Sequence, residues 1–196
     1  MRTLLVCITA CFFVAKIPAQ VVVSDLDLQK RLDEYMIFNK QLNFEKLMDY
    51  IHPSLFKIVP RDKFIEIFEE SFDNDKMKIT IDSMIISAIG PSFKHGETLY
   101  KKIDFYMSMD LKLKDTTSKD DEDFVLTMIT ALKDGFPDHS VRYDKDTDKF
   151  IIKGSDIMFA IKDKPQAKWM FLGYQKNPEM INALYPKDVI AHFKLL

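Results

Sequence analysis

Three aspartates in one short segment have the spacing of a calcium-binding loop. Asp144, Asp146 and Asp148 occupy alternate positions, from which carboxylates can bind one hard cation. A calcium loop also needs glycine at its sixth position and a bidentate glutamate at its twelfth, and this chain has Lys149 and Ser155 there. The segment is therefore predicted to be a polar turn between two strands, and no metal site is predicted.

The histidines and glycines form no catalytic motif. None of the four histidines is followed four residues later by a second ligand or lies in an H-E-x-x-H frame. The chain has no G-x-S-x-G motif and, with only five glycines, no glycine-rich phosphate loop. No catalytic residue and no cofactor are therefore predicted from motifs. The histidines are His52, His95, His139 and His192.

The first nineteen residues have the layout of a secretory signal peptide. Arg2 is followed by about twelve apolar residues, a run shorter than the roughly 20 that span a bilayer. A small residue, Ala19, precedes Gln20, so we expect signal peptidase to cleave between them. The segment Ile8-Thr9-Ala10-Cys11 also resembles a bacterial lipobox, although apolar residues continue directly past the cysteine. We expect a secreted or periplasmic protein, with a lipoprotein anchored at Cys11 as the alternative.

Loss of this segment would change the charge and the thiol content of the protein. The whole chain has 28 basic and 30 acidic residues, and removal of Arg2 and Lys16 takes the formal net charge from −2 to −4. An acidic domain is not expected to bind nucleic acid or an anionic membrane by electrostatic attraction. Both cysteines, Cys7 and Cys11, lie in the signal segment, so neither a disulfide nor thiol chemistry is expected. Residues 20–196 are long enough for one domain with its own core.

The first half of this domain is predicted to be helical. Ser24 is the expected N-cap of a helix that extends to about Gln41, because apolar residues recur there at helical spacing. A second helix over 43–51 ends at a His-Pro pair, since the residue before proline disfavours helical geometry. Residues 54–59 are expected to be extended, and Pro60 begins a third helix at the position that proline favours.

The second half is predicted to consist mainly of strands. From Met77 the apolar residues alternate with a period of two, and the alternation shifts phase at Ser83 as it does at a β-bulge. A strand over 98–114 has about seventeen residues, against a usual length of about five or six, and this length predicts a strongly curved sheet. The further elements are an amphipathic helix over 118–134, strands over 141–143, 149–153, 156–162 and 168–174, and short helices that begin at Asn177 and Pro186.

These elements predict a single α+β domain, with N-terminal helices packed on a strongly curved antiparallel sheet, an inserted helix and short C-terminal helices. Their order resembles the cone-shaped, cystatin-like superfamily of nuclear transport factor two, ketosteroid isomerase and the polyketide cyclases. The resemblance runs from Tyr35 to Phe68 and centres on the segment from Asn43 to Pro53. It implies a divergent exported bacterial member with a largely apolar pocket closed by helices. The implied ligand-contacting residues are Tyr35, His52, Val59, Met107 and Trp169.

The resemblance also implies that a catalytic base has been lost. Isomerase members use a tyrosine on the first helix, where Tyr35 falls here, and an aspartate directly before a proline. That second position holds Val59, before Pro60, and valine cannot accept a proton. We therefore expect a non-catalytic domain that binds a small apolar ligand, a peptide or a protein partner in the pocket. The alternative is an isomerase- or cyclase-type enzyme with His52 or Asp104 as its base. A carboxylate or histidine facing the pocket within reach of Tyr35 would favour that alternative.

The same architecture suggests two further kinds of partner. The sheet face is a candidate surface for a cell-envelope protein. Members of the superfamily commonly form homodimers through the sheet, and the outward-facing Tyr106 would suit such an interface. No membrane-spanning segment is expected once the signal peptide is removed.

Overall fold

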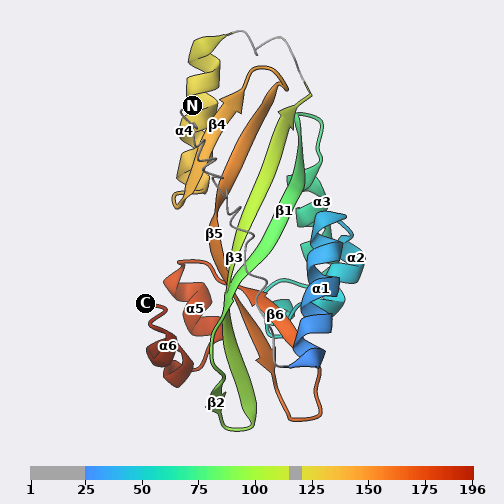
Figure 1. Ribbon diagram of the computed structural model, residues 1–196, viewed down its shortest axis with the longest axis vertical. Coiled ribbons are helices and arrows are strands. Elements are labelled where there is room, and N and C mark those ends of the chain that lie inside the picture. Colours follow the sequence, from blue (N-terminus) through green and yellow to red (C-terminus); the bar gives the residue numbers. More distant parts are fainter. Residues whose placement is uncertain (1–24, 115–120) are drawn as a thin grey trace, which may run out of the picture.

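The computed structural model describes residues 25–114 and 121–196. In these residues the N-terminal helices pack on a six-stranded antiparallel sheet, one helix is inserted before the fourth strand, and two short helices follow the last strand (Figure 1). This arrangement confirms the predicted α+β class. The expected cleavage site at Ala19 and Gln20 lies outside the described residues, as do both cysteines.

Side-chain caps fix where the N-terminal helices begin. The carboxylate of Asp25 accepts a hydrogen bond from Leu28 N at 3.1 Å, so the first helix is capped by Asp25 and not by the expected Ser24. The second helix follows its cap Asn43, as predicted, but continues as a 3₁₀ helix after Leu47. Pro60 is the N-cap of the third helix and not its predicted first residue. The described helices are α1 (Leu26–Lys40), α2 (Phe44–Leu47), the 3₁₀ helices η1 (Met48–Tyr50) and η2 (Leu55–Lys57), α3 (Arg61–Phe72), α4 (Glu122–Gly135), α5 (Pro178–Leu184) and α6 (Lys187–Phe193).

The expectation that residues 54–59 are extended is wrong. The carbonyls of His52, Pro53 and Ser54 accept hydrogen bonds from the backbone amides three residues later, at 3.1, 3.1 and 3.3 Å, and so form η2. A short apolar run does not distinguish such a 3₁₀ turn from a strand. The extended residue nearby is Ile51, which forms an isolated parallel bridge with Phe171.

The sheet is built on one long strand, β3, which has 16 residues. The strand order is β1-β3-β5-β4, while β2 pairs with the start of β3 and β6 with the end of β5. The register of β1 shifts between Ile81 and Ser83, which confirms the predicted bulge, and again between Ile86 and Ala88. Figure 1 shows the long, strongly twisted sheet that results. The strands are β1 (Met77–Ile89), β2 (Phe93–His95), β3 (Thr98–Leu113), β4 (His139–Asp144), β5 (Lys149–Lys162) and β6 (Met170–Gly173).

Strand β5 joins two segments, 149–153 and 156–162, that the sequence predicts as separate strands. β3 keeps its pairing across the join, where Met107 lies opposite Gly154 and Tyr106 opposite Ser155. A glycine followed by a serine is a local signal for a break in a strand. Continuous pairing with β3 overrides that signal.

The two ends of the sheet have different surroundings. At one end, Met158–Ile161 of β5 are all buried, which requires cover on both faces because strand side chains alternate between faces. Figure 1 shows α1–α3 and α5–α6 on opposite sides of the strands there. At the other end, Val141 and Ile152 form an apolar cluster with residues of α4, whereas Lys112 is exposed.

The later helices begin at or near the predicted positions. Asn177 caps α5 and Pro186 precedes α6, as predicted, and Asp121 caps α4 inside the predicted range. The longest described helix, α1, has 15 residues. No described helix combines the length and the apolar composition that a membrane crossing takes.

Candidate functional site

A cavity of about 330 Å³ lies where β5 changes its pairing partner. β5 pairs with β4 as far as Gly154 and with β6 from Met158 onward, so Asp156 and Ile157 lie between the two partner strands. The volume lies within the range of about 300–1,000 Å³ that is typical of small-molecule sites. Most of the wall is apolar and includes Ile51, Leu55, Phe64, Phe68, Phe105, Leu172, Met180 and Leu184.

Tyr35 is the one member of the predicted ligand-contacting set that lines this cavity. It projects from α1 and packs on Phe171, with the ring centroids 4.8 Å apart. The residue is buried, and burial raises the pKa of the Tyr35 hydroxyl. The hydroxyl therefore stays protonated at neutral pH and can donate a hydrogen bond.

Tyr185 brings a second phenol to the cavity wall. Its ring lies 5.2 Å from that of Phe159, between centroids, and the residue is 5% exposed. Burial raises the pKa of Tyr185 far above its ordinary value, so its hydroxyl stays protonated. Within the described residues this buried hydroxyl forms no hydrogen bond. A buried donor without an acceptor costs about 1–3 kcal/mol of folding free energy.

Asp156 is the charged residue of the cavity lining. His139 Nε2 lies 3.0 Å from Asp156 Oδ2, and the side chain of His139 is 5% exposed against 35% for that of Asp156. The buried imidazole of His139 therefore holds Oδ2 of Asp156 in place from the interior side. The second oxygen, Oδ1, makes no hydrogen bond to the described residues. The cavity therefore contains a positioned hydrogen-bond acceptor in a largely apolar wall.

Gly154 makes room for the histidine that positions Asp156. His139 lies opposite Gly154 in the β4–β5 pairing, and a Cβ atom at position 154 would collide with the imidazole. Phe136 packs edge-on against the same ring, with the centroids 5.5 Å apart. The imidazole is therefore confined on two sides, and this confinement keeps the carboxylate of Asp156 in place.

An ion pair ties together two segments beside the cavity. Lys176 Nζ lies 2.6 Å from Asp138 Oδ2. Lys176 follows Gln175, a lining residue, and Asp138 precedes His139. The hydrogen bond from Lys176 lowers the pKa of Asp138, which keeps the pair charged. The pair thus connects the loop before α5 with the start of β4.

Two of the other predicted ligand-contacting residues have structural contacts elsewhere. His52 Nδ1 lies 2.8 Å from Ser54 Oγ, and its Nε2 lies 3.3 Å from Asp163 Oδ1. Trp169 is 1% exposed and donates from Nε1 to Asp25 Oδ2 at 2.9 Å. Neither side chain lines the cavity.

The remaining predicted residues also lie outside the cavity lining. Val59 is half-buried in the turn between η2 and α3, and Met107 is half-buried on β3. Asp104, the acid that the sequence analysis offered as a base, forms an ion pair with Lys102 at 2.9 Å. None of these three side chains shares the cavity with Tyr35.

The structure joins Tyr35 with two residues that the sequence analysis did not single out, Asp156 and Tyr185. Asp156 is the one acidic residue between Phe150 and Ile161, in a strand with many buried neighbours. A carboxylate in such a strand is costly to bury, and this cost is a signal that could have found it. Tyr185 carries no comparable signal, since an aromatic residue in an apolar pattern is usually part of a core.

The D-x-D-x-D segment is the turn of the β4–β5 hairpin, as predicted. Asp144 pairs with Lys149 across it. Asp148 has a φ of 54° and accepts a hydrogen bond from the Tyr143 hydroxyl at 2.7 Å. Within residues 25–114 and 121–196, no group of three His, Cys, Asp or Glu side chains is placed to hold a metal ion.

A scan against models of known protein families finds no match, and a search of curated proteins finds none either. The resemblance to the cone-shaped superfamily therefore stays a prediction.

Proposed function

We propose that this protein binds, without chemically changing it, a small and mainly apolar molecule that carries one amino or hydroxyl group. The observation that carries the proposal is Asp156, the charged side chain in the lining of a largely apolar cavity. Its Oδ1 atom accepts a hydrogen bond from the ligand, while the aromatic and aliphatic walls bury the rest. Each 100 Å² of apolar ligand surface removed from water contributes about 2.5 kcal/mol to binding.

The size of the cavity favours a small molecule over a peptide or a protein segment. A volume of about 330 Å³ accommodates a compact bicyclic molecule. The Tyr35 hydroxyl, from the same lining, gives the ligand a hydrogen-bond donor in addition to the acceptor on Asp156. A hydroxyl group on the ligand can use both, because it donates and accepts at once.

We further propose that binding takes place outside the cytoplasm, in a secreted or periplasmic protein. What supports this proposal is the layout of residues 1–19, in which a basic start precedes a short apolar run and a small residue at position 19. An exported domain without cysteines has no thiol that the oxidising conditions of those compartments could convert to a disulfide.

Three bicyclic probes of nearly equal size test the binding proposal. They are 1-(aminomethyl)naphthalene, 1-naphthalenemethanol and 1-ethylnaphthalene, which differ only in one terminal group. In fluorescence titrations we expect the amine and the alcohol to bind about tenfold more tightly than the ethyl compound, since a hydrogen bond to a charged group contributes about 1.5–3 kcal/mol.

Substitution of the carboxylate identifies the group responsible. Asp156→Asn is expected to weaken binding of the amine about tenfold and that of the alcohol less, because Asn keeps an acceptor but loses the charge. Asp104→Asn removes an acid of the same sheet outside the cavity and is expected to change neither affinity. Equal affinities for all three probes, or an unchanged amine affinity in Asp156→Asn, would contradict the proposal.

A second candidate function is proton transfer next to a carbonyl group. It is favoured by the presence of a carboxylate, Asp156, and a phenol donor, Tyr35, in the lining of one cavity. Asp156 would remove the proton, and the Tyr35 hydroxyl would stabilise the resulting oxyanion. Exchange of the α-protons of 2-tetralone for deuterium, monitored by NMR, tests this function. Exchange that is lost in Asp156→Asn would establish an enzyme, whereas binding of 2-tetralone without exchange would establish a binding protein.

A further inference from the structure

Three lysines form a row across neighbouring strands at the α4 end of the sheet. Lys78 of β1 lies directly opposite Lys112 of β3. Lys149 begins β5 and precedes Phe150, the partner of Leu111, so it lies on the other flank of Lys112. Since neighbouring strands are about 4.8 Å apart, the row is about 10 Å wide.

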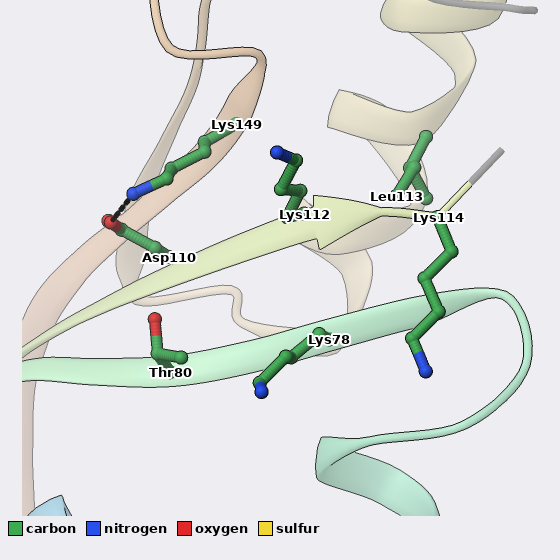
Figure 2. A pocket seen from close by; sticks show the side chains of 7 residues that line it. All are labelled: Lys78, Thr80, Asp110, Lys112, Leu113, Lys114 and Lys149. Atoms are coloured by element: carbon green, nitrogen blue, oxygen red, sulfur yellow. Dashed lines mark hydrogen bonds and ion pairs between the residues drawn. The ribbon is translucent and has the colours of Figure 1, made fainter. Parts of the chain in front are cut away.

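This row lines a hollow of about 400 Å³ on the sheet, distinct from the apolar cavity (Figure 2). The alternate residues of the same strands, such as Ile79 and Met109, belong to the apolar cluster that includes residues of α4. Strand side chains alternate between faces, so Lys78 and Lys112 project away from that cluster, and both are exposed. The hollow is completed by Thr80, Asp110, Leu113 and Lys114.

Positive charge exceeds negative charge around the hollow. Lys149 Nζ lies 3.0 Å from Asp110 Oδ2. Lys114 Nζ lies 2.7 Å from Asp73 Oδ1, and Lys78 Nζ lies 3.6 Å from the other oxygen of the same aspartate. Two carboxylates are therefore shared among three ammonium groups, and one positive charge is left unneutralised. This excess occurs in a chain whose net charge is negative.

Lys112, in the middle of the row, differs from the other three lysines of the hollow. It has no ion-pair partner in the part of the chain that the structure describes. It lies between Lys78 and Lys149, and like charges directly opposite one another on neighbouring strands destabilise a sheet. Lys78 and Lys149 each have a carboxylate partner, so Lys112 is the unneutralised positive charge of the row. An anion bound at Lys112 would offset this repulsion.

We propose that this hollow binds a soluble molecule through a phosphate or diphosphate group. Lysine ammonium groups are common phosphate ligands, and the Thr80 hydroxyl adds a neutral donor to the same hollow. Two linked phosphates present more oxygens to the ammonium groups of the row than one isolated phosphate does. The occupant is a small soluble molecule, because the site is a hollow with a carboxylate, Asp110, in its lining and not a protruding basic surface.

Thermal unfolding with and without inorganic pyrophosphate tests the proposal, at constant ionic strength and low millimolar concentrations. We expect the midpoint of the full-length protein to rise with pyrophosphate and to saturate. Without the anion, the midpoint of Lys112→Gln is expected to match or exceed that of the wild type, since the substitution relieves the repulsion in the row. With the anion, the midpoint of Lys112→Gln is expected to rise by less than half of the wild-type rise. Lys94→Gln removes an exposed lysine of β2 outside the hollow and should respond as the wild type does.

Two outcomes would overturn the proposal. Equal rises in the wild type, Lys112→Gln and Lys94→Gln would show a general effect of anions on the protein. Lys112-dependent binding to phosphatidylglycerol vesicles without any response to pyrophosphate would identify a lipid surface as the occupant. Calorimetric titration gives an independent measure, in which Lys112→Gln is expected to weaken pyrophosphate binding at least fivefold.

Discussion

The imidazole of His139 occupies the space in which a side chain at position 154 would begin, directly across the β4–β5 pairing. Gly154 therefore has a role beyond its place in the middle of a strand. It leaves room for the ring beside the backbone of β5, from where Nε2 reaches Asp156 at 3.0 Å. The position of Asp156, the charged residue that the described part of the chain gives to the cavity lining, thus depends on a missing side chain two residues earlier on its own strand.

Gly154→Ala is expected to lower the free energy of unfolding by about 1–3 kcal/mol, because the added methyl group overlaps the confined imidazole. It is also expected to weaken binding of 1-(aminomethyl)naphthalene, since Asp156 loses its support. Urea denaturation checks the first effect. Gly135→Ala is the matched control, because a Cβ there meets nothing within 4 Å. An equal response of the two variants would show that position 154 is not crowded.

Tyr185→Phe is expected to raise the free energy of unfolding of the empty protein by about 1 kcal/mol, because it removes a buried hydroxyl without an acceptor. Tyr174→Phe is the matched comparison, since the Tyr174 hydroxyl donates to Leu195 O at 2.8 Å. Tyr174→Phe should lower the free energy of unfolding by about 1 kcal/mol. Similar decreases in the free energy of unfolding of both variants, measured by urea denaturation, would argue against an unsatisfied Tyr185 hydroxyl.

Asp25 makes the stability of the fold dependent on pH. Burial acts to raise the pKa of Asp25, but hydrogen bonds from Leu28 N and Trp169 Nε1 and the charge of Lys162 outweigh it, so the pKa is lowered. A lowered pKa in the folded state stabilises the fold above the unfolded-state pKa of about 3.9, and this contribution is lost as the pH falls through the lower folded-state value.

Asp25→Asn is therefore expected to be less stable than the wild type at pH 7, by about 1 kcal/mol, because a charged acceptor is replaced by a neutral one. The difference should shrink as the pH falls below about 3.9. Denaturant unfolding at a series of pH values measures it. A difference that is constant from pH 7 to pH 3 would mean that Asp25 does not titrate in the way its contacts imply.

The mature protein from its own host is expected to begin at Gln20. Intact-mass spectrometry would then give a mass that corresponds to residues 20–196. A lipid-modified chain that begins at Cys11 would establish the lipoprotein alternative. Retention of the uncut N-terminus in a correctly localised protein would contradict export by signal cleavage.

Features that depend on neighbouring residues in the sequence could be predicted well. Asn43, Asn177 and Pro186 begin helices because capping is decided within one turn. The bulge near Ser83 was visible because a phase shift in the alternation is itself a local pattern. In contrast, the continuity of β5 across Gly154 depends on pairing with β3, and no local pattern records that pairing.

The apolar cavity and the lysine hollow were harder to predict, because each depends on the register in which the strands pair. His139 and Asp156 come together only through the pairing of β4 with β5. Similarly, Lys78, Lys112 and Lys149 are separated by more than thirty residues at each step along the chain, so no local pattern brings them together. The net charge of the chain is an average over all faces, so it argued against phosphate binding while one face of the sheet concentrates ammonium groups.

The two register shifts in β1 also govern how this sheet meets other molecules. β1 is the outer strand of the described sheet, and a straight edge of its length would be a template for strand addition and aggregation. The shifts leave Asp82 and Ser87 without partners in β3 and bend the edge at both points. An incoming strand would therefore find only short stretches of hydrogen-bonding groups in register, one of them beside a carboxylate. The irregularities that shape the sheet thus also protect its edge against self-association.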